Sequence, residues 1–254
     1  MADYPDLRDK VVIVTGAARG LGAALARAFD RQGVRLALVD IDPEALGGLG
    51  ADVGSGTDRL LLEIADLAQT AACEPLVERV AEHFGSLDVL VNNAAVLKRA
   101  PMEEVSVADF EAALRVNLMA PWFLTRAAIT QMRRQGRGGR IVNVASMAGR
   151  TGGVGDVHPY AASKGGLLAV TKSLARAAAA DGILVNAILP SNIESAMLRD
   201  SFPPEAIERT MSQVPLGRTA APDEVAELVL WLSSQASSYV TGVSWDIDGG
   251  WFMS

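Results

Sequence analysis

The chain has few of the residues that build disulfides and metal sites. Its 254 residues include one cysteine, Cys73, and two histidines, His83 and His158. One cysteine cannot form an internal disulfide, and with two histidines it completes none of the common zinc ligand sets. No apolar signal segment stands at the start of the sequence. We therefore expect no metal site, and we expect a protein of the reducing cytoplasm.

The sequence also lacks an excess of basic residues and an apolar run long enough for a membrane. There are 23 Lys and Arg against 30 Asp and Glu, which gives a net charge of −7 at pH 7. This balance disfavours a nucleic acid duplex or an anionic membrane as the partner. The uncharged stretch from Leu228 to Trp245 contains serines, a glutamine and a threonine, so it is too polar to span a bilayer. We expect a small-molecule partner.

What the chain does have is enough apolar sequence for one large core. Hydrophobic residues make up 50% and charged residues 21% of the composition. A chain of this length can bury about three quarters of the surface that it exposes when unfolded. No interdomain linker, repeat or low-complexity tract interrupts it. The sequence therefore predicts a single domain over residues 1–254.

Short β-branched apolar runs alternate with longer Ala-rich amphipathic segments along the whole chain. This alternation is typical of repeated βαβ units, and the runs lack the period-two pattern of strands with one wet face. We predict an α/β fold of the Rossmann type, a doubly wound parallel sheet of about seven strands with helices on both faces. The predicted strands are Val11 to Thr15, Arg35 to Asp40, Arg59 to Ile64, Leu87 to Asn92, Arg140 to Ala145, Ile183 to Ile188 and Val243 to Ile247.

The segment 190–215 breaks this rhythm with several prolines and scattered apolar residues. We predict that it forms a mobile lid over a substrate site.

A glycine-rich turn joins the first predicted strand to the first predicted helix. Gly16, Gly20 and Gly22 are spaced G-x-x-x-G-x-G, and glycine there lets backbone amides approach a pyrophosphate at a helix N-terminus. The second strand ends at Asp40, whose carboxylate can accept hydrogen bonds from the hydroxyls of an adenosine ribose. Asp42 is the better candidate for the cap of the next helix. Together these residues indicate a dinucleotide site.

Tyr160 and Lys164 lie four residues apart in a predicted helix, on one face. An ammonium within about 4 to 6 Å can lower a tyrosine pKa by about 1 to 3 units, so the pair predicts a phenolate usable near neutral pH. Ser146 follows a strand, where its hydroxyl can bond the reacting oxygen. Alone, the Tyr and Lys spacing is also that of a buried tyrosine beside a solvated lysine, and the glycine turn favours the catalytic interpretation.

With the turn, this set resembles the short-chain dehydrogenase/reductase family over essentially the whole chain. The resemblance implies that Tyr160 is a general acid/base, that Ser146 positions the substrate oxygen, that Lys164 binds the nicotinamide ribose, and that Asn117 holds a water in a proton relay. Asn92 to Ala95 and the C-terminal Asp246 to Gly250 also resemble family segments. The cofactor contacts that it implies are Gly16, Arg19, Gly20, Leu21, Gly22, Asp40, Ile41, Asp66, Leu67, Asn93, Ala94, Tyr160, Lys164, Pro190, Ile193 and Ser195.

Three features depart from the family pattern. Ala95 replaces a usual glycine, which is tolerable if its φ is negative. Ser191 stands for a usual glycine, and Ser195 for a usual threonine whose hydroxyl it keeps. The spacing from Ser146 to Tyr160 is one residue longer than expected, and the glycine-containing loop between them can absorb the extra residue.

The resemblance implies an NAD(H)-dependent oxidoreductase that interconverts a secondary alcohol and a ketone. Asp40 and the adjacent Ile41 favour NAD over NADP, whereas Arg19 can accompany NADP use. Two alternatives remain open: a 3-oxoacyl-thioester reductase using NADPH, and a catalytically silent NAD(H)-binding protein on the same fold.

The substrate can be a polyol or sugar, a cyclic diol, a steroid or a hydroxyacyl compound. The residues that we expect to line its pocket are Val96, Leu97, Met147, Gly153 to His158, Asn192, Ile193, Glu194 and Met197, although His158 and Glu194 also suit solvent-facing positions at helix starts. The apolar C-terminal end predicts a homo-oligomer, a tetramer, with the segment 221–232 and the last strand in an interface.

Overall fold

The computed structural model describes residues 2–54 and 58–253. Within this part of the chain, one seven-stranded sheet runs in the order β3-β2-β1-β4-β5-β6-β7, and each neighbouring pair is parallel. The predicted fold class is confirmed. The strands are β1 (Val11–Thr15), β2 (Arg35–Asp40), β3 (Leu60–Ile64), β4 (Val89–Asn92), β5 (Gly139–Val144), β6 (Ile183–Pro190) and β7 (Ser244–Ile247).

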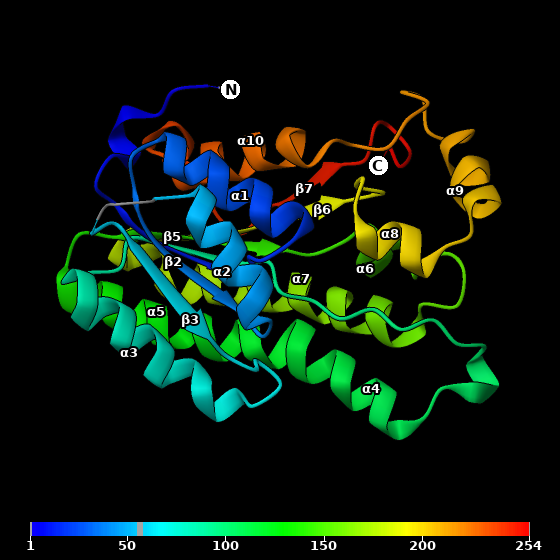
Figure 1. Cartoon of the computed structure of the whole chain (residues 1–254), viewed down its shortest axis with the longest axis horizontal. Helices are drawn as coiled ribbons and strands as arrows, with labels where there is room; N and C mark the ends of the chain where they lie inside the picture. Colours follow the sequence, from blue (N-terminus) through cyan, green and yellow to red (C-terminus); the bar gives the residue numbers. More distant parts are fainter. Residues whose placement is uncertain (1, 55–57, 254) are drawn as a thin grey trace.

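Helices cover both faces of the sheet. Figure 1 shows α1, α2 and α10 on one face and α3, α5 and α7 on the other. The helices are α1 (Gly20–Arg31), α2 (Pro43–Asp52), α3 (Cys73–Phe84), α4 (Val107–Leu114), α5 (Ala120–Gln135), α6 (Ala148–Thr151), α7 (His158–Ala178), α8 (Ala196–Ser201), α9 (Pro204–Met211) and α10 (Pro222–Ser233).

Strand β1 illustrates why the apolar runs show no alternation. Val12 and Val14 pack into the core beneath α1 and α10, whereas Val11 and Ile13 pack into the core beneath α3 and α5. Since both faces are dry, every position of a central strand favours an apolar side chain. The sheet therefore separates two cores.

The chain reverses its direction of travel across the sheet beside β1. The two neighbours of β1 in the sheet are β2 on one side and β4 on the other. In open parallel sheets, ligands bind outside the carboxyl ends of the strands at this point, because the loops diverge there and leave a crevice. The topology thus locates the site before any side chain is considered.

The predicted strand boundaries differ from the observed ones by one or two residues. Strand β3 begins at Leu60 instead of Arg59, β4 begins at Val89 instead of Leu87, and β6 ends at Pro190 instead of Ile188. A 3₁₀ turn over Thr70–Ala72 precedes α3. Helix α7 begins at His158, with Pro159 in its first turn, where a missing N–H costs nothing.

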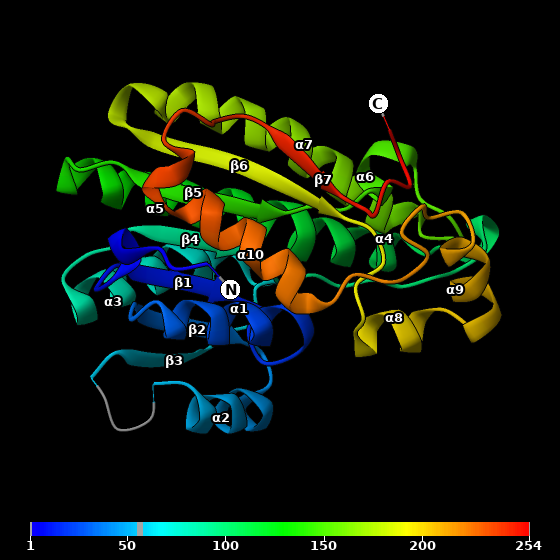
Figure 2. The same cartoon turned by 90° about the horizontal axis from the view of Figure 1, so that it is seen from above.

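The predicted lid, residues 190–215, contains the two short helices α8 and α9. Neither helix has a buried residue. Figure 2 shows both of them beyond the carboxyl end of β6, apart from the layers that cover the sheet. They lie where a substrate site is expected.

Candidate active site

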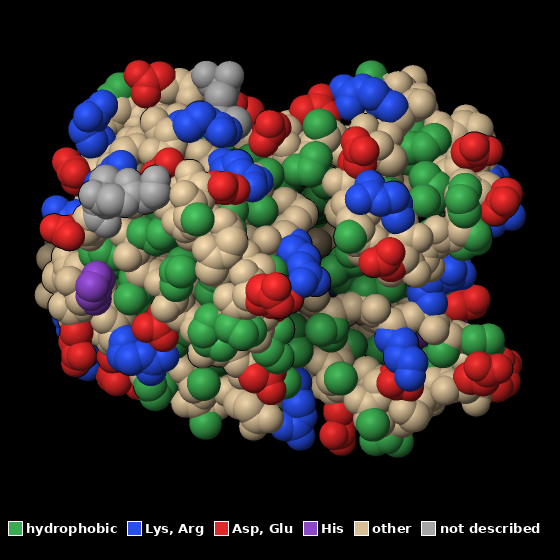
Figure 3. All heavy atoms as spheres, in the orientation of Figure 1, with side chains coloured by type: hydrophobic (Ala, Val, Ile, Leu, Met, Phe, Trp, Pro, Cys, Tyr) green, Lys and Arg blue, Asp and Glu red, His purple; other side chains and the backbone are tan. Residues whose placement is uncertain are grey.

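A cavity of about 700 Å³ opens at the carboxyl ends of the strands. The glycine turn, the ends of β2, β4, β5 and β6, the start of α7 and the lid all contribute to its lining. The face drawn in Figure 3 is hollowed beside the lid, and hydrophobic side chains gather around the hollow. One cavity therefore contains the predicted dinucleotide residues and three of the four predicted catalytic residues, Ser146, Tyr160 and Lys164.

The glycine turn packs so closely against backbone that two of its positions admit no side chain. Gly16 has a φ of +61°, and a Cβ added to it would lie 2.7 Å from the Cα of Ala94. A Cβ on Gly22 would lie 1.9 Å from the carbonyl oxygen of Gly16. Helix α1 begins at Gly20, and the N–H groups of a first helical turn have no partner within the helix. The turn fits a pyrophosphate group.

Hydrogen bonds fasten this turn to the end of β4. The hydroxyl of Thr15 accepts from the N–H groups of Asn93 at 3.0 Å and Ala94 at 3.1 Å. The side-chain amide of Asn93 donates to the carbonyls of Thr15 at 2.9 Å and Gly16 at 3.0 Å. Asn93 and Ala94 line the cavity, as predicted for cofactor contacts. We had not assigned this bridging role to Thr15, and nothing in the sequence alone links its hydroxyl to a residue of β4.

Of the two aspartates at the end of β2, Asp40 lines the cavity and Asp42 caps the next helix, as predicted for the cap. The carboxylate of Asp40 lines the cavity and accepts from the N–H groups of Ala18 at 2.9 Å and Asp42 at 3.1 Å. Asp42 caps α2, accepting from the N–H of Ala45 at 3.0 Å. The carboxylate of Asp42 also pairs with the guanidinium of Arg19. Arg19 therefore has an acidic partner of its own.

Ile41, Asp66 and Leu67 line the part of the cavity that lies beyond the carboxyl ends of β2 and β3. Ile41 is 63% exposed, so it leaves an apolar surface free at the rim. The carboxylate of Asp66 accepts from the N–H of Ala68 at 2.9 Å, which fixes the loop after β3. These positions agree with the contacts that the resemblance implies.

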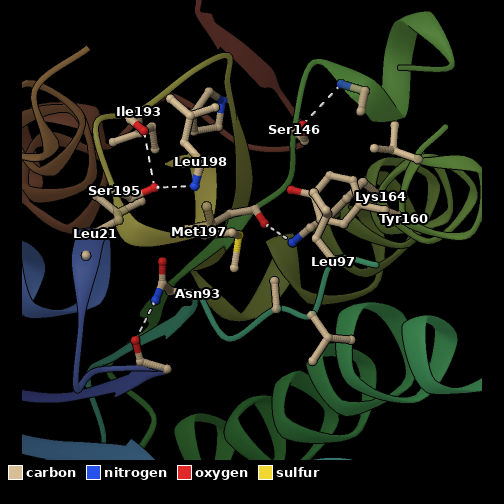
Figure 4. A pocket seen from close by; sticks show the side chains of 18 of the residues that line it. Leu21, Asn93, Leu97, Ser146, Tyr160, Lys164, Ile193, Ser195, Met197 and Leu198 are labelled. Carbon is tan, nitrogen blue, oxygen red and sulfur yellow. Dashed lines mark hydrogen bonds between the residues drawn. The ribbon is translucent and has the colours of Figure 1, made fainter. Parts of the chain in front are cut away.

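Ser146, Tyr160 and Lys164 meet at the centre of the cavity (Figure 4). The hydroxyl of Ser146 lies just beyond β5 and accepts from the N–H of Ala148 at 3.1 Å. Tyr160 and Lys164 lie one turn apart on α7, and the Lys164 ammonium is 5.7 Å from the centre of the Tyr160 ring. Lys164 is 2% exposed, and its Nζ donates to the carbonyl of Val144 at 2.7 Å. The helical spacing thus gives the adjacency that the sequence predicted.

The pKa shifts at this centre differ from the expected ones. Burial lowers the pKa of Lys164 to about 7, because the ammonium has lost its water. Burial raises the pKa of Tyr160, and the hydrogen bond from Ser146 opposes that rise. The prediction that Lys164 would lower the tyrosine pKa is wrong for this state. The desolvation that weakens the phenolate also removes much of the positive charge that was to stabilise it.

Asn117 is fully buried in a π-helical turn, Arg115–Met119, between α4 and α5. Its amide nitrogen donates to the carbonyl of Val96 at 2.9 Å and to the Ser163 hydroxyl at 3.0 Å, while its oxygen accepts from the Val96 N–H at 2.8 Å. Asn117 does not line the cavity. Because both amide hydrogens are used, its side chain ties the segment after β4 to α7.

The residues predicted to contact the substrate divide into two groups. Leu97, Met147, Asn192 and Met197 line the cavity, as do Val96 and Ile193. Gly153, Val154, Gly155 and Val157 line it too. Asp156, His158 and Glu194 do not, so the predictions for these three residues are wrong. His158 is the first residue of α7, and its imidazole faces solvent. The side chain is 48% exposed and lies 3.9 Å from the carboxylate of Asp156. The Glu194 side chain is 69% exposed and lies 3.9 Å from Arg199.

The departures from the family pattern have local explanations. Ala95 is not among the described residues with a positive φ, so the lost glycine costs no backbone strain. The extra residue before Tyr160 is absorbed in a loop where Gly152, Gly153 and Gly155 all have positive φ. The Ser195 hydroxyl caps α8, accepting from the Leu198 N–H at 3.2 Å and donating to the Ile193 carbonyl at 3.2 Å (Figure 4). Pro190, Ile193 and Ser195 all line the cavity.

The residues that line the cavity without having been predicted include Arg99, Phe202 and Trp251. Phe202 lies inside the predicted lid, residues 190–215. Arg99 follows the predicted pocket residues by only two positions, and Trp251 follows the C-terminal glycines. Their places depend on how separate loops meet, and the sequence pattern carries no signal for that.

Residues 2–54 and 58–253 contain no cluster of three metal-ligand side chains and no helix that is long and apolar enough to cross a membrane.

The model of a family described as enoyl-(acyl carrier protein) reductase matches residues 16–252. A short-chain type dehydrogenase/reductase from Mycobacterium marinum has a similar structure, with a TM-score of 0.93 and 29% identity over 99% of both chains. The chain belongs to the short-chain dehydrogenase/reductase family. The family membership and the fold thus agree with the residues from which both were predicted.

Curated short-chain dehydrogenases with different substrates are about equally similar to the chain. Galactitol 2-dehydrogenase of Agrobacterium fabrum is 36% identical over 98% of this chain and 99% of its own. The 3-oxoacyl-[acyl-carrier-protein] reductase of Thermotoga maritima is 38% identical over 96% and 98%. D-threitol dehydrogenase of Mycolicibacterium smegmatis is 36% identical over 96% and 94%. Overall identity therefore gives oxidoreductase chemistry and a nicotinamide cofactor, and it does not choose among substrates.

Proposed function

We propose that the protein is an NAD(H)-dependent oxidoreductase that interconverts a secondary alcohol and a ketone. The observation that carries this proposal is the meeting of Ser146, Tyr160 and Lys164 in the cavity that the glycine turn also lines. An acid/base group and a dinucleotide cradle in one cavity suit a hydride transfer coupled to a proton transfer. Polyol dehydrogenases among the similar proteins support an alcohol substrate.

The residues present fit a nicotinamide dinucleotide. The turn from Gly16 to Gly22 would hold the pyrophosphate, Asp40 would accept from the adenosine ribose, and Lys164 would contact the second ribose. When bound, the cofactor supplies or accepts the hydride. The role of the protein is to orient both partners and to move the proton.

Tyr160 is the proposed acid/base. Because burial raises its pKa, the phenol carries its proton at neutral pH and can donate it to a carbonyl oxygen in the reductive direction. The Ser146 hydroxyl would bond the same oxygen and hold it against the phenol. Lys164, with a pKa of about 7, can return a proton to the phenolate that this donation leaves, because the tyrosine has the higher pKa of the two and the transfer runs downhill.

NAD is the proposed cofactor because Asp40 faces the place of the ribose. A 2′-phosphate beside this carboxylate would bring like charges together, which costs several kcal/mol. Arg19 can offset the repulsion only if it leaves Asp42, with which it is paired. The pair therefore supports the preference for NAD.

The second candidate is a 3-oxoacyl-thioester reductase that uses NADPH, and the Thermotoga maritima relative favours it. It differs from the first in cofactor and in substrate length. A protein that binds NADH without any turnover is the remaining alternative.

The deciding experiment combines NADH binding, followed by fluorescence, with turnover of a panel of polyols, sugars, cyclic diols, hydroxysteroids and 3-hydroxyacyl thioesters. Oxidation of an alcohol with NAD supports the proposal. Activity confined to thioesters with NADP supports the reductase, and binding with no turnover supports the silent protein.

We further propose that the protein is a cytoplasmic homotetramer. Trp245 is 40% and Met253 is 79% exposed at the C-terminal end, beside the edge strand β7. Apolar surface of this kind is typically covered by a second copy in a closed assembly. Light scattering at micromolar concentration tests this, and a monomeric mass contradicts it.

A further inference from the structure

We propose that Arg99 fastens the lid helix α8 across the substrate end of the cavity, and that this restricts the enzyme to alcohols small enough to leave the fastening intact. The second part of the proposal rests on the proposed function. The first part concerns the protein without any ligand.

The guanidinium of Arg99 bridges two segments that are distant in sequence. Its Nε donates to the carbonyl of Gly155 at 2.6 Å, in the loop before α7. Its Nη1 donates to the carbonyl of Ser201 at 2.8 Å, at the C-terminal end of α8. The guanidinium also lies over the ring of Phe202, 4.7 Å from its centre. Arg99 thus joins three walls of the cavity.

The rest of the lid offers little that would replace this bridge. Within residues 2–54 and 58–253, the bond from Arg99 to Ser201 is the only hydrogen bond from outside the lid to α8 or α9. Neither helix buries a residue. The base of the lid is fixed separately, where Asn192 and Glu194 bond through their backbones to Ala220. The segment before α8 is therefore fixed through Asn192 and Glu194, and the C-terminal end of α8 is held by Arg99.

The chemistry of the bridge suits a fastening. The last carbonyls of a helix lack partners within the helix and carry a partial negative charge, so a cation is favoured there. Hydrogen bonds from a charged donor are stronger than neutral ones. The planar fork of arginine reaches two acceptors at once, which a lysine ammonium on a flexible stem does not reproduce.

The fastening also has a consequence for the substrate. Leu97 on one side and Met197 and Phe202 on the other line the cavity, and Arg99 joins their segments. A compact alcohol can bind in the cavity while these segments stay joined. A substrate whose chain must pass between the loop and α8 has to break the bond to Ser201 and uncover Phe202.

Limited proteolysis of the ligand-free protein tests the fastening. Trypsin can cut after Arg199 and Arg209, which lie in the lid helices, and the cleavage rate follows the population of the opened lid. We expect Arg99→Met, which keeps an apolar side chain beside Phe202, to raise the cleavage rate at these sites by about tenfold. Arg99→Lys should raise it nearly as much.

Arg126→Ala is the matched control, since Arg126 also lies over aromatic rings, Trp122 and Phe123, but far from the lid in sequence and on α5. It should leave the cleavage rate after Arg199 and Arg209 unchanged. An unchanged rate in both Arg99 variants, with circular dichroism as in the wild type, overturns the proposal. A wild-type rate in Arg99→Lys alone overturns the two-acceptor bridge.

Steady-state kinetics test the consequence for substrates. With galactitol and D-threitol as small probes, Arg99→Met should raise KM severalfold and leave kcat within about twofold, because the variant does not alter Ser146, Tyr160 or Lys164. With the 3-hydroxybutyryl thioester of N-acetylcysteamine, kcat/KM relative to the small probes should rise. An unchanged ratio contradicts the size restriction. If the wild-type protein turns over none of these probes, an alcohol that is oxidised in the wider panel replaces them. If the whole panel fails, the proposed function fails, while the proteolysis still decides whether Arg99 fastens the lid.

Discussion

The two ends of the cavity are held in very different ways. At the proposed dinucleotide end, Thr15 and Asn93 alone make four short bonds that fix the glycine turn to the segment after β4, and a Cβ on Gly16 or Gly22 would collide with backbone. At the proposed substrate end, α8 and α9 have no buried residue, and Arg99 bonds the end of α8 to the loop before α7.

This contrast matches the two tasks of the site. A cofactor with a constant shape is best bound by a preorganised cradle, because no ordering cost is then spent at each binding event. A substrate must enter and leave, so the elements that cover it come from the low-stability part of the fold. The same scaffold can therefore keep one end fixed and vary the other.

The largest effect should come from the group between the two ends. Tyr160→Phe removes the proton that the phenol donates and keeps the ring, so turnover should fall by about 10² to 10⁴. NADH binding and tryptic cleavage of the lid should both remain at the wild-type level. Retention of more than a tenth of the turnover would exclude Tyr160 as the acid/base.

Asp40→Asn probes the fixed end. The substitution removes the charge and keeps a side chain that can accept from the Ala18 N–H. We expect the ratio of kcat/KM for NAD to that for NADP to fall by about a hundredfold, since like charges at close range cost several kcal/mol and each 1.4 kcal/mol is about tenfold. The ratio of the NADH affinity to the NADPH affinity should fall as well. An unchanged ratio would show that Asp40 does not contact the ribose.

Lys164→Met tests the cost of burying the ammonium at the junction of the two ends. The pKa of Lys164 is about 7 in the folded protein and about 10.4 in an unfolded chain. Below pH 7 the lysine carries its proton in both the folded and the unfolded chain, and the full cost of burying the ammonium lowers the stability of the folded protein. Between pH 7 and 10 the unfolded state binds more protons, so the wild type gains stability as the pH rises.

The variant lacks this titration. Between pH 7 and 9.5, the free energy of unfolding of the wild type should therefore increase relative to that of Lys164→Met by about 3 kcal/mol. Urea unfolding at the two pH values measures the difference. A difference that does not change with pH would mean that Lys164 keeps an ordinary pKa.

The smallest effect should come from Asp42→Asn, which tests whether the pairing of Arg19 with Asp42 contributes to the preference for NAD. Asparagine still caps α2, but it releases the guanidinium of Arg19. We expect kcat/KM for NADP to rise by about three- to tenfold with little change for NAD. The gain should vanish in Arg19→Ala/Asp42→Asn, and a gain that persists there would exclude Arg19 as its source.

The sequence by itself determined the parallel sheet, the glycine turn and the pair of Tyr160 and Lys164. These features depend on local properties: apolar runs with both faces covered, glycines that alone tolerate a positive φ, and the helical repeat that places residues four apart on one face.

Only the tertiary structure decided the electrostatics and the closure of the site. The spacing of Tyr160 and Lys164 predicted a lowered tyrosine pKa. The surrounding core removes water from both groups, which raises the pKa of Tyr160 and lowers that of Lys164. His158 satisfied the spacing of a pocket residue, yet α7 turns it to solvent. Arg99 gave no signal, because its partners at Gly155 and Ser201 lie far along the chain and are brought to it only by folding. Burial and long-range contact are properties of the whole fold, so a local pattern does not encode them.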